Sequence, residues 1–318
     1  MLAVGHAPAG GSLYSLIHLG GFAGDLAHYR KHCTGARRVL ELGCGDGRVA
    51  AALCLGEAPL SILQQQLQQE DEEVVVAVVD KEAVEVEQLP PPSPPVPSTS
   101  PRPTSQALEY LGIELCAELA AKAALRLAAS PSAQILNADF HDKLKGHEPF
   151  DAVVVSANTL FCTPRHANVL TRCAEAVGPS GLLLLDVYNA LPFHEDACEE
   201  QVCGEKEFQD SQDGGAGIDD EDLLVVVEDE EGREWSVYEQ EPVVGVEAKQ
   251  ITCTYDFRSA DGEVFTQSVE HHYVLPEDLV RLVSDAGFEI QAISGDFLGT
   301  TFDPEESEHV VLTARLAA

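Results

Sequence analysis

Three glycines at alternate positions, Gly43, Gly45 and Gly47, have the spacing in this chain that most directly suggests ligand binding. They follow an apolar run at 39–42 and precede an alanine-rich stretch, which predicts a buried strand, a tight turn and a helix. Because glycine has no Cβ and tolerates positive φ, the backbone can approach a ligand closely at such a turn. The helix N-terminus beyond it offers free N–H groups. Glu41, at the end of the strand, suits a ligand that carries an amino group.

The spacing Gly-x-Gly-x-Gly differs from the dinucleotide-binding fingerprint, Gly-x-Gly-x-x-Gly. A NAD-dependent dehydrogenase is therefore a distant interpretation. A strand–turn–helix whose glycines bind no ligand remains the alternative. The rest of the chain must distinguish it from a ligand-binding turn.

The net charge of −35 over 318 residues is unevenly placed along the chain. Residues 195–231 hold sixteen Asp and Glu against Lys206 alone, and residues 57–87 hold nine against Lys81 alone. Such a charge repels phosphate backbones and anionic lipids, which disfavours nucleic acid and membrane surfaces as partners. It permits a cationic or amine-bearing substrate, although a solvated acidic face explains both runs equally well.

The cysteines predict a reducing compartment. There are nine, an odd number, at scattered spacings and without a Cys-x-x-Cys pair, which argues against both a disulfide framework and a zinc site. No apolar run approaches the roughly 20 residues needed to span a bilayer, and the first residues do not resemble a signal peptide. We expect a soluble, cytoplasmic protein.

Residues 57–106 differ in composition from the rest of the chain and predict an insertion. The segment contains a Gln- and Glu-rich stretch and ends in two proline-rich runs, 90–95 and 97–103. Proline removes hydrogen-bond donors and blocks both helices and central strands, so we expect the second half to be extended and poorly ordered.

The insertion leaves two candidates for the second strand of an α/β sheet. Val74–Asp80 is apolar and ends in an acid, but only a short acidic stretch and prolines follow it. Tyr110–Glu114 is also apolar and ends in an acid, and an alanine-rich helix follows it. We therefore prefer Tyr110–Glu114 and expect 74–80 to be a peripheral strand or a disordered stretch.

Strands and helices continue to alternate beyond this point, which predicts a doubly wound α/β sheet. The expected strands are 133–137, 150–156 and 182–186, and a helix over 164–177 stops at Gly178-Pro-Ser-Gly181. The acidic segment 195–222 predicts a mobile loop.

The last third of the chain predicts an antiparallel insertion and then the end of the sheet. The four strand-like runs are 223–228, 234–241, 247–258 and 263–274, the last two joined by a Ser-Ala-Asp-Gly turn. A helix over 276–287 and strands over 288–294 and 309–315 follow. The expected organisation is 1–56 (N-terminal helical region and first half of the binding domain), 57–106 (insertion), 107–190 (rest of the domain), 191–222 (acidic loop), 223–274 (antiparallel insertion) and 275–318 (final helix and strands).

Taken in order, these features resemble the class I S-adenosylmethionine (SAM) dependent methyltransferases. Glu41–Gly47 is similar to the motif I of that family, and Gly112–Glu114 to its ribose-binding strand. Asn137–Phe140, Phe150–Ser156 and Gly178–Asp186 are similar to the later motifs. The antiparallel insertion resembles the subgroup that modifies small molecules. The resemblance implies a Rossmann-like doubly wound sheet with an inserted antiparallel β-meander, SAM as cofactor and a small-molecule acceptor.

The resemblance also implies roles for individual residues. Glu41 would lie near the amino end of the methionine part, and the glycine backbone would allow that part to approach. Glu114 would accept hydrogen bonds from the ribose hydroxyls, which suit a carboxylate. Asp139 would accept from the adenine amino group, Phe140 would pack on the ring, and the backbone at Ser156 would meet the amino acid part. Asp46 departs from the family, which often has a small or hydroxyl residue there.

Transfer from an activated sulfonium needs positioning and exclusion of water, and an amine or hydroxyl acceptor also needs a general base. Side chains expected near the strand C-termini supply the candidates: Tyr14, His18, Asn158, Tyr188, Asn189, His271 and His272. Of the His271–His272 pair only one can face the cleft, since successive side chains on a strand alternate. No metal-ligand set is visible.

Two other functions remain open. An aminopropyltransferase that uses decarboxylated SAM shares the fold, although Glu41 and the lack of a polyamine motif disfavour it. A non-catalytic SAM-binding or protein-interaction module would use the acidic and proline-rich segments as contacts.

Overall fold

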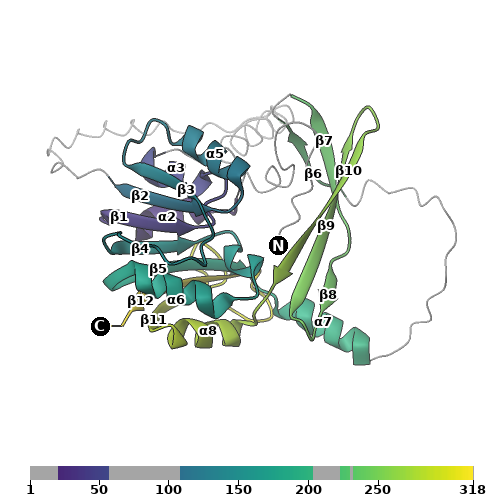
Figure 1. Ribbon diagram of the computed structural model, residues 1–318. Coiled ribbons are helices and arrows are strands. Elements are labelled where there is room, and N and C mark those ends of the chain that lie inside the picture. The colour runs from purple at the N-terminus through teal and green to yellow at the C-terminus, as the bar shows by residue number, and fades with distance from the viewer. Residues whose placement is uncertain (1–20, 57–107, 203–222, 230–231, 318) are drawn as a thin grey trace, which may run out of the picture.

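The computed structural model describes residues 21–56, 108–202, 223–229 and 232–317. Its main element is a sheet of seven strands in the order β11-β12-β5-β4-β1-β2-β3 (Figure 1). The first five strands in the chain are parallel: β1 (Arg38–Leu42), β2 (Glu109–Glu114), β3 (Ala133–Asn137), β4 (Phe150–Val155) and β5 (Val177–Tyr188). Two strands close one edge, β11 (Phe288–Ser294) and the antiparallel β12 (His309–Leu316).

The central strands are apolar because both of their faces are covered. One face packs on α2 (Asp25–His32) and α3 (Arg48–Cys54), and the other on α6 (His166–Ala176) and α8 (Pro276–Asp285). A further helix, α5 (Ala117–Arg126), packs against β2 and β3. Parallel strands connected in this way bring their C-terminal ends to one edge of the sheet, where ligands of such folds bind.

A second, antiparallel sheet lies beside this edge (Figure 1). Its strands run in the order β10-β9-β7-β6, and β8 pairs with β9. The bounds are β6 (Leu223–Glu228), β7 (Glu234–Glu239), β8 (Val243–Gly245), β9 (Gln250–Ser259) and β10 (Val264–His272). Trp235, Val237 and Phe257 form part of its own small core. Ile251, Tyr273 and Val274 instead belong to the core of the main sheet, so the two sheets are packed together.

The structure confirms the predicted fold class, the antiparallel insertion and the placing of Tyr110–Glu114 next to β1. Val74–Asp80 and the rest of the 57–106 insertion lie outside the described residues. The prediction of a loop over 191–222 was wrong for its first part, which forms helix α7 (Leu191–Val202). Phe193 and His194 pack this helix onto Tyr188 and Tyr273, contacts that its acidic composition did not reveal. The three-residue strand β8 was also not predicted.

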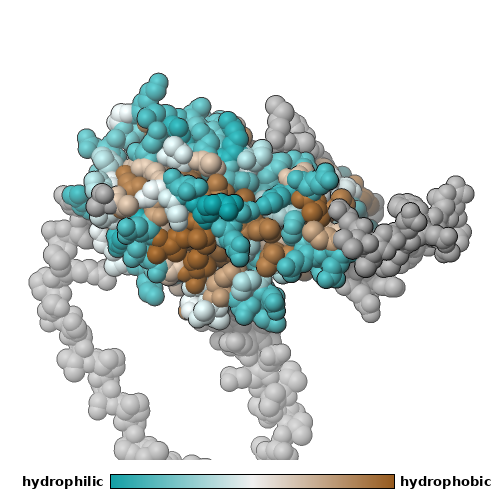
Figure 2. Space-filling view, turned by 90° about the horizontal axis from the view of Figure 1, so that it is seen from below, coloured by the Kyte–Doolittle hydropathy of each residue, from teal (hydrophilic) through white to brown (hydrophobic). Residues whose placement is uncertain are grey.

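Figure 2 views the protein from below and shows apolar surface gathered in patches, with polar residues around them. The larger patch lies on the side where α8 and β11 are seen in Figure 1. This face is therefore not uniformly acidic, despite the net charge of −35. Within the described ranges, no helix is both long and apolar enough to cross a membrane.

Candidate functional site

The glycine loop, residues 43–47, is held against β2 by its backbone. The N–H groups of Gly43 and Cys44 both donate to the carbonyl of Ile113, at 2.8 and 3.1 Å. Gly43 has a φ of 69°, and a Cβ there would lie 2.5 Å from the Thr159 side chain. Gly47 has a φ of 85°, and a Cβ there would lie 3.1 Å from the Ala123 backbone. A Cβ on Gly45 would meet nothing within 4 Å, although its φ is also positive. The loop is thus packed at both ends and open at Gly45.

Glu114 lies beside this open position. Its Oε2 accepts the Gly45 N–H at 2.9 Å, and its Oε1 accepts the Cys116 N–H at 2.8 Å. The parallel register of β1 and β2 brings the carboxylate to the loop from a distant part of the chain. A carboxylate has about four acceptor sites, so the two that remain suit a pair of hydroxyl donors.

Leu115 is an exposed apolar residue beside Glu114 that the sequence analysis did not single out. It follows Glu114 directly, and 59% of its surface is exposed. Asn137 Nδ2 donates to the carbonyls of Glu114 and Leu115, at 2.9 and 2.8 Å, and so fixes the backbone here. The signal that could have found it is a large apolar residue after the strand-end acid, where the chain leaves the sheet.

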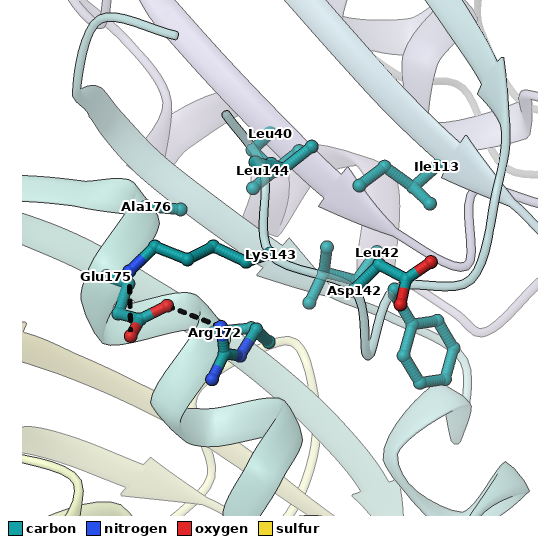
Figure 3. A pocket seen from close by; sticks show the side chains of 10 residues that line it. Leu40, Leu42, Ile113, Asp142, Lys143, Leu144, Arg172, Glu175 and Ala176 are labelled. Atoms are coloured by element: carbon teal, nitrogen blue, oxygen red, sulfur yellow. Dashed lines mark ion pairs between the residues drawn. The ribbon is translucent and has the colours of Figure 1, made fainter. Parts of the chain in front are cut away.

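Asp139 and Phe140 begin the connection from β3 to β4. Asp139 Oδ1 accepts the His141 N–H at 2.8 Å, its other oxygen lies 3.8 Å from Arg165 Nη2, and 40% of the side chain is exposed. The half-buried Phe140 lines a pocket beneath this connection, whose floor includes Leu40, Leu42 and Ile113 (Figure 3). Because side chains alternate along β1, this pocket lies on the sheet face opposite Glu41.

The rim of this pocket is charged but paired. Glu175 lies 3.3 Å from Lys143 Nζ and 2.7 Å from Arg172 Nη1 (Figure 3). Both pairs are partly exposed, so they close the edge of the pocket rather than offer a free charge to a ligand.

A carboxylate layer lies on the other face of the sheet, beneath the glycine loop. It consists of Asp25, Glu41 and Asp186, each no more than 2% exposed. Arg48 Nη2 lies 2.6 Å from Asp25. Glu41 accepts hydrogen bonds from the Tyr110 hydroxyl and from Ser156 Oγ, the latter at 3.0 Å. Burial raises the pKa of Glu41 to about 7 and that of Asp186 to about 6, because a buried carboxylate loses the hydration of its charge.

This layer holds three acidic groups against one guanidinium, which favours a positively charged ligand above it. The contact of Glu41 with the amino end of SAM stays a prediction, since the structure gives both Glu41 oxygens protein partners.

The turn after β4, residues 156–158, connects the neighbouring strands. Ser156 Oγ reaches Glu41 on β1 as described, and the Ala157 N–H donates to Asp186 on β5 at 3.0 and 3.1 Å. Asn158 Oδ1 accepts the N–H of Tyr188 at 2.7 Å. Asn158 therefore joins the turn to the end of β5, and its catalytic role stays a prediction.

An aromatic cluster lies next to this turn and consists of Phe161, Tyr188, Phe193 and His271. The Tyr188 ring centroid lies 5.0 Å from Phe161, 6.0 Å from Phe193 and 5.7 Å from His271. Phe161 belongs to the short helix η1 (Thr159–Cys162) after β4, and Tyr188 ends β5. His271 comes from β10 of the second sheet. The structure thus brings two predicted candidates, Tyr188 and His271, together at the C-terminal edge.

The other candidates have different positions. His272 Nε2 lies 3.1 Å from Glu270 Oε1 on one face of β10, so the alternation along the strand places His271, not His272, in the cluster. Asn189 is 2% exposed and donates to the carbonyls of Pro304 and Ser307, which is a structural role. Tyr14 and His18 lie outside the described residues. Across the part of the chain that the structure describes, no group of three or more His, Cys, Asp or Glu side chains could hold a metal ion.

Solved structures of methyltransferases share this arrangement of elements. The CcbJ methyltransferase from Streptomyces caelestis is 19% identical, with a TM-score of 0.58 over 94% of this chain and 92% of that chain. KedS8, a sugar N-methyltransferase from Streptoalloteichus sp ATCC 53650, is 18% identical, with a TM-score of 0.55 over 100% of both chains. SAM-bound CalS10, an amino pentose methyltransferase from Micromonospora echinaspora, is 16% identical, with a TM-score of 0.53 over 98% of this chain and 100% of that chain.

These identities are low, so the likeness shows the fold. No family model and no curated protein matches the sequence significantly. The chain has the class I SAM-dependent methyltransferase fold, with a separate antiparallel sheet beside the main one.

Proposed function

We propose that this protein is a SAM-dependent methyltransferase that acts on a small-molecule acceptor with an amine nitrogen. The observation that carries the proposal is the carboxylate of Glu114 bonded to the Gly45 N–H, at the open position of the glycine loop. The carboxylate layer supports a cofactor that carries positive charge. The aromatic cluster on the same edge supports an acceptor site. The amine is favoured by the net charge of −35 and by neighbours that are described as amino pentose and sugar N-methyltransferases.

In this proposal the described residues of the edge divide the work. Glu114 holds the ribose, Leu115 and Phe140 cover the adenine with Asp139 at its amino group, and the glycine loop and the 156–158 turn meet the amino acid part. SAM supplies a methyl group already activated on a sulfonium, so the protein needs to align the acceptor in line with it and exclude water. Tyr188 and His271 orient the acceptor, and His271 is the candidate base that receives a proton from the amine nitrogen of the acceptor.

Calorimetric titration with S-adenosylhomocysteine tests the cofactor part of the proposal. We expect micromolar affinity for the wild type and binding weakened about 30-fold in Glu114→Ala, because charge-assisted hydrogen bonds are among the strongest that a site loses. Glu118→Ala is the matched control, since Glu118 lies on the neighbouring helix α5 and pairs only weakly with Lys122 at 3.9 Å. A folded wild type that fails to bind would contradict the proposal and favour the non-catalytic protein-interaction module.

Transfer of a labelled methyl group from SAM to a panel of small amines and alcohols then tests the acceptor. Labelling of amines supports the proposal, and labelling confined to alcohols contradicts the choice of nitrogen. Transfer of an aminopropyl group from decarboxylated SAM would instead indicate an aminopropyltransferase.

A further inference from the structure

The turn after β4 adopts an unusual backbone conformation. Ala157 and Asn158, two consecutive residues other than glycine, have φ of 50° and 61°. Residues with a Cβ rarely occupy this left-handed region, and they stay there only when the surrounding structure over-determines them. Such outliers gather at functional sites, and this one lies between the carboxylate layer and the aromatic cluster.

Three successive hydrogen bonds hold the turn. Ser156 is joined to β1 through its hydroxyl, Ala157 to β5 through its N–H, and Asn158 to the end of β5 through its side chain. The turn is thereby fixed from both strands that flank β4. Two of these bonds go to carboxylates, and the Ala157 N–H has both oxygens of its acceptor, Asp186, in range, at 3.0 and 3.1 Å.

Asp186 is an expensive residue to place here if its purpose is stability alone. It is 1% exposed, lies on the same face of the sheet as Glu41, and accepts a second hydrogen bond from the Tyr29 hydroxyl of α2. Arg48, the nearby guanidinium, pairs with Asp25 instead. A buried carboxylate without a directly bonded cation is costly, and an apolar residue of similar volume would fill the same space at lower cost.

We propose that Asp186 is a positioning residue for the cofactor and acceptor sites. It holds the Ala157 N–H, and through it the backbone of the 156–158 turn that faces the amino acid part of SAM. The bond from Tyr188 to Asn158 passes the same constraint to the aromatic cluster. Asp186 touches neither reactant, and its role rests on the function proposed above.

The test compares three variants by calorimetric titration with S-adenosylhomocysteine. Asp186→Ala removes the acceptor, and we expect affinity about 10-fold lower or worse, the loss typical of a charge-assisted hydrogen bond. Asp186→Asn keeps an oxygen for the Ala157 N–H, with its amide nitrogen toward Tyr29, and we expect affinity within about 3-fold of wild type. Val311→Ala is the matched control, because Val311 pairs with Asp186 in β12, is 3% exposed and touches the core instead of the turn. We expect it to lower the melting temperature and keep the affinity.

Hydrogen–deuterium exchange over residues 150–162 gives a second readout that a general loss of stability would not produce. We expect faster exchange at the turn in Asp186→Ala, and wild-type exchange there in Asp186→Asn and Val311→Ala. Asp186→Ala that binds like the wild type, or affinity that follows melting temperature alone in all three variants, would overturn the positioning role. A folded wild type that fails to bind would overturn the proposed function and the positioning role together.

Discussion

The glycine loop and the aromatic cluster, which both lie at the C-terminal edge of the main sheet, are held by different kinds of contact. Around the glycine loop, backbone N–H groups and carboxylates set the geometry, and the loop is bonded to the C-terminal end of β2. In the aromatic cluster, side-chain rings from η1, β5, α7 and β10 meet. Backbone geometry follows from a short motif, whereas a cluster of rings requires distant segments to fold together. In the proposed function, cofactor recognition would combine a short local motif with one strand register, β1 on β2, while acceptor recognition would depend on the packing of the second sheet.

The largest expected effect is on stability, from a substitution in the aromatic cluster. Phe161 is fully buried, and Phe161→Ala should lower the free energy of unfolding by about 3–5 kcal/mol because it leaves a cavity in the main core. Phe193, in the same cluster, is 43% exposed, so Phe193→Ala should cost about 1 kcal/mol or less. Urea unfolding of both variants and the wild type measures the two losses in the free energy of unfolding. Equal losses would show that the cluster is not anchored through η1.

The next prediction concerns the carboxylate layer and pH. The pKa of Glu41 is about 7 in the folded protein against 4.5 for the free group, so the folded state holds the proton more tightly between these values. Its contribution to stability is complete below pH 4.5 and is lost as the pH rises through 7, by up to about 3 kcal/mol. Glu41→Gln has no such titration, so its stability should rise relative to the wild type over this window.

Urea unfolding of Glu41→Gln and the wild type from pH 5 to pH 8 checks the sign. Glu118→Gln, a half-exposed carboxylate on α5, serves as control and should run parallel to the wild type. Parallel curves for Glu41→Gln would contradict the burial of a titrating group beneath the glycine loop.

The smallest expected effect distinguishes the aromatic cluster from the glycine loop by comparing methyl transfer with cofactor affinity. His271→Ala should keep the affinity for S-adenosylhomocysteine within about 3-fold and lower methyl transfer about 10-fold or more, since general bases contribute at least that much. His272→Ala, its neighbour on β10, pairs with Glu270 and should change neither measurement. A loss of affinity in His271→Ala would show that the aromatic cluster also supports the cofactor.

Local sequence predicted the glycine-loop side well. The alternation of glycines located the turn, and an acid followed by a strong helix identified Glu114 across a long insertion. Leu115, which the proposed function places at the adenine, was not singled out because a single apolar residue after a strand end has no periodic signal. For Asn158 the sequence did not reveal the hydrogen bond from the Tyr188 N–H, since this bond depends on how the turn after β4 meets the end of β5.

The sequence by itself determined the alternating strands and helices and the glycine loop, because period, turn residues and strand-end acids are all encoded over a few neighbouring positions. Only the tertiary structure decided that His271 rather than His272 faces Tyr188, that α7 forms from an acidic segment, and that Asp186 meets Ala157. Each of these depends on the register and packing of elements far apart in the chain, which no local pattern specifies.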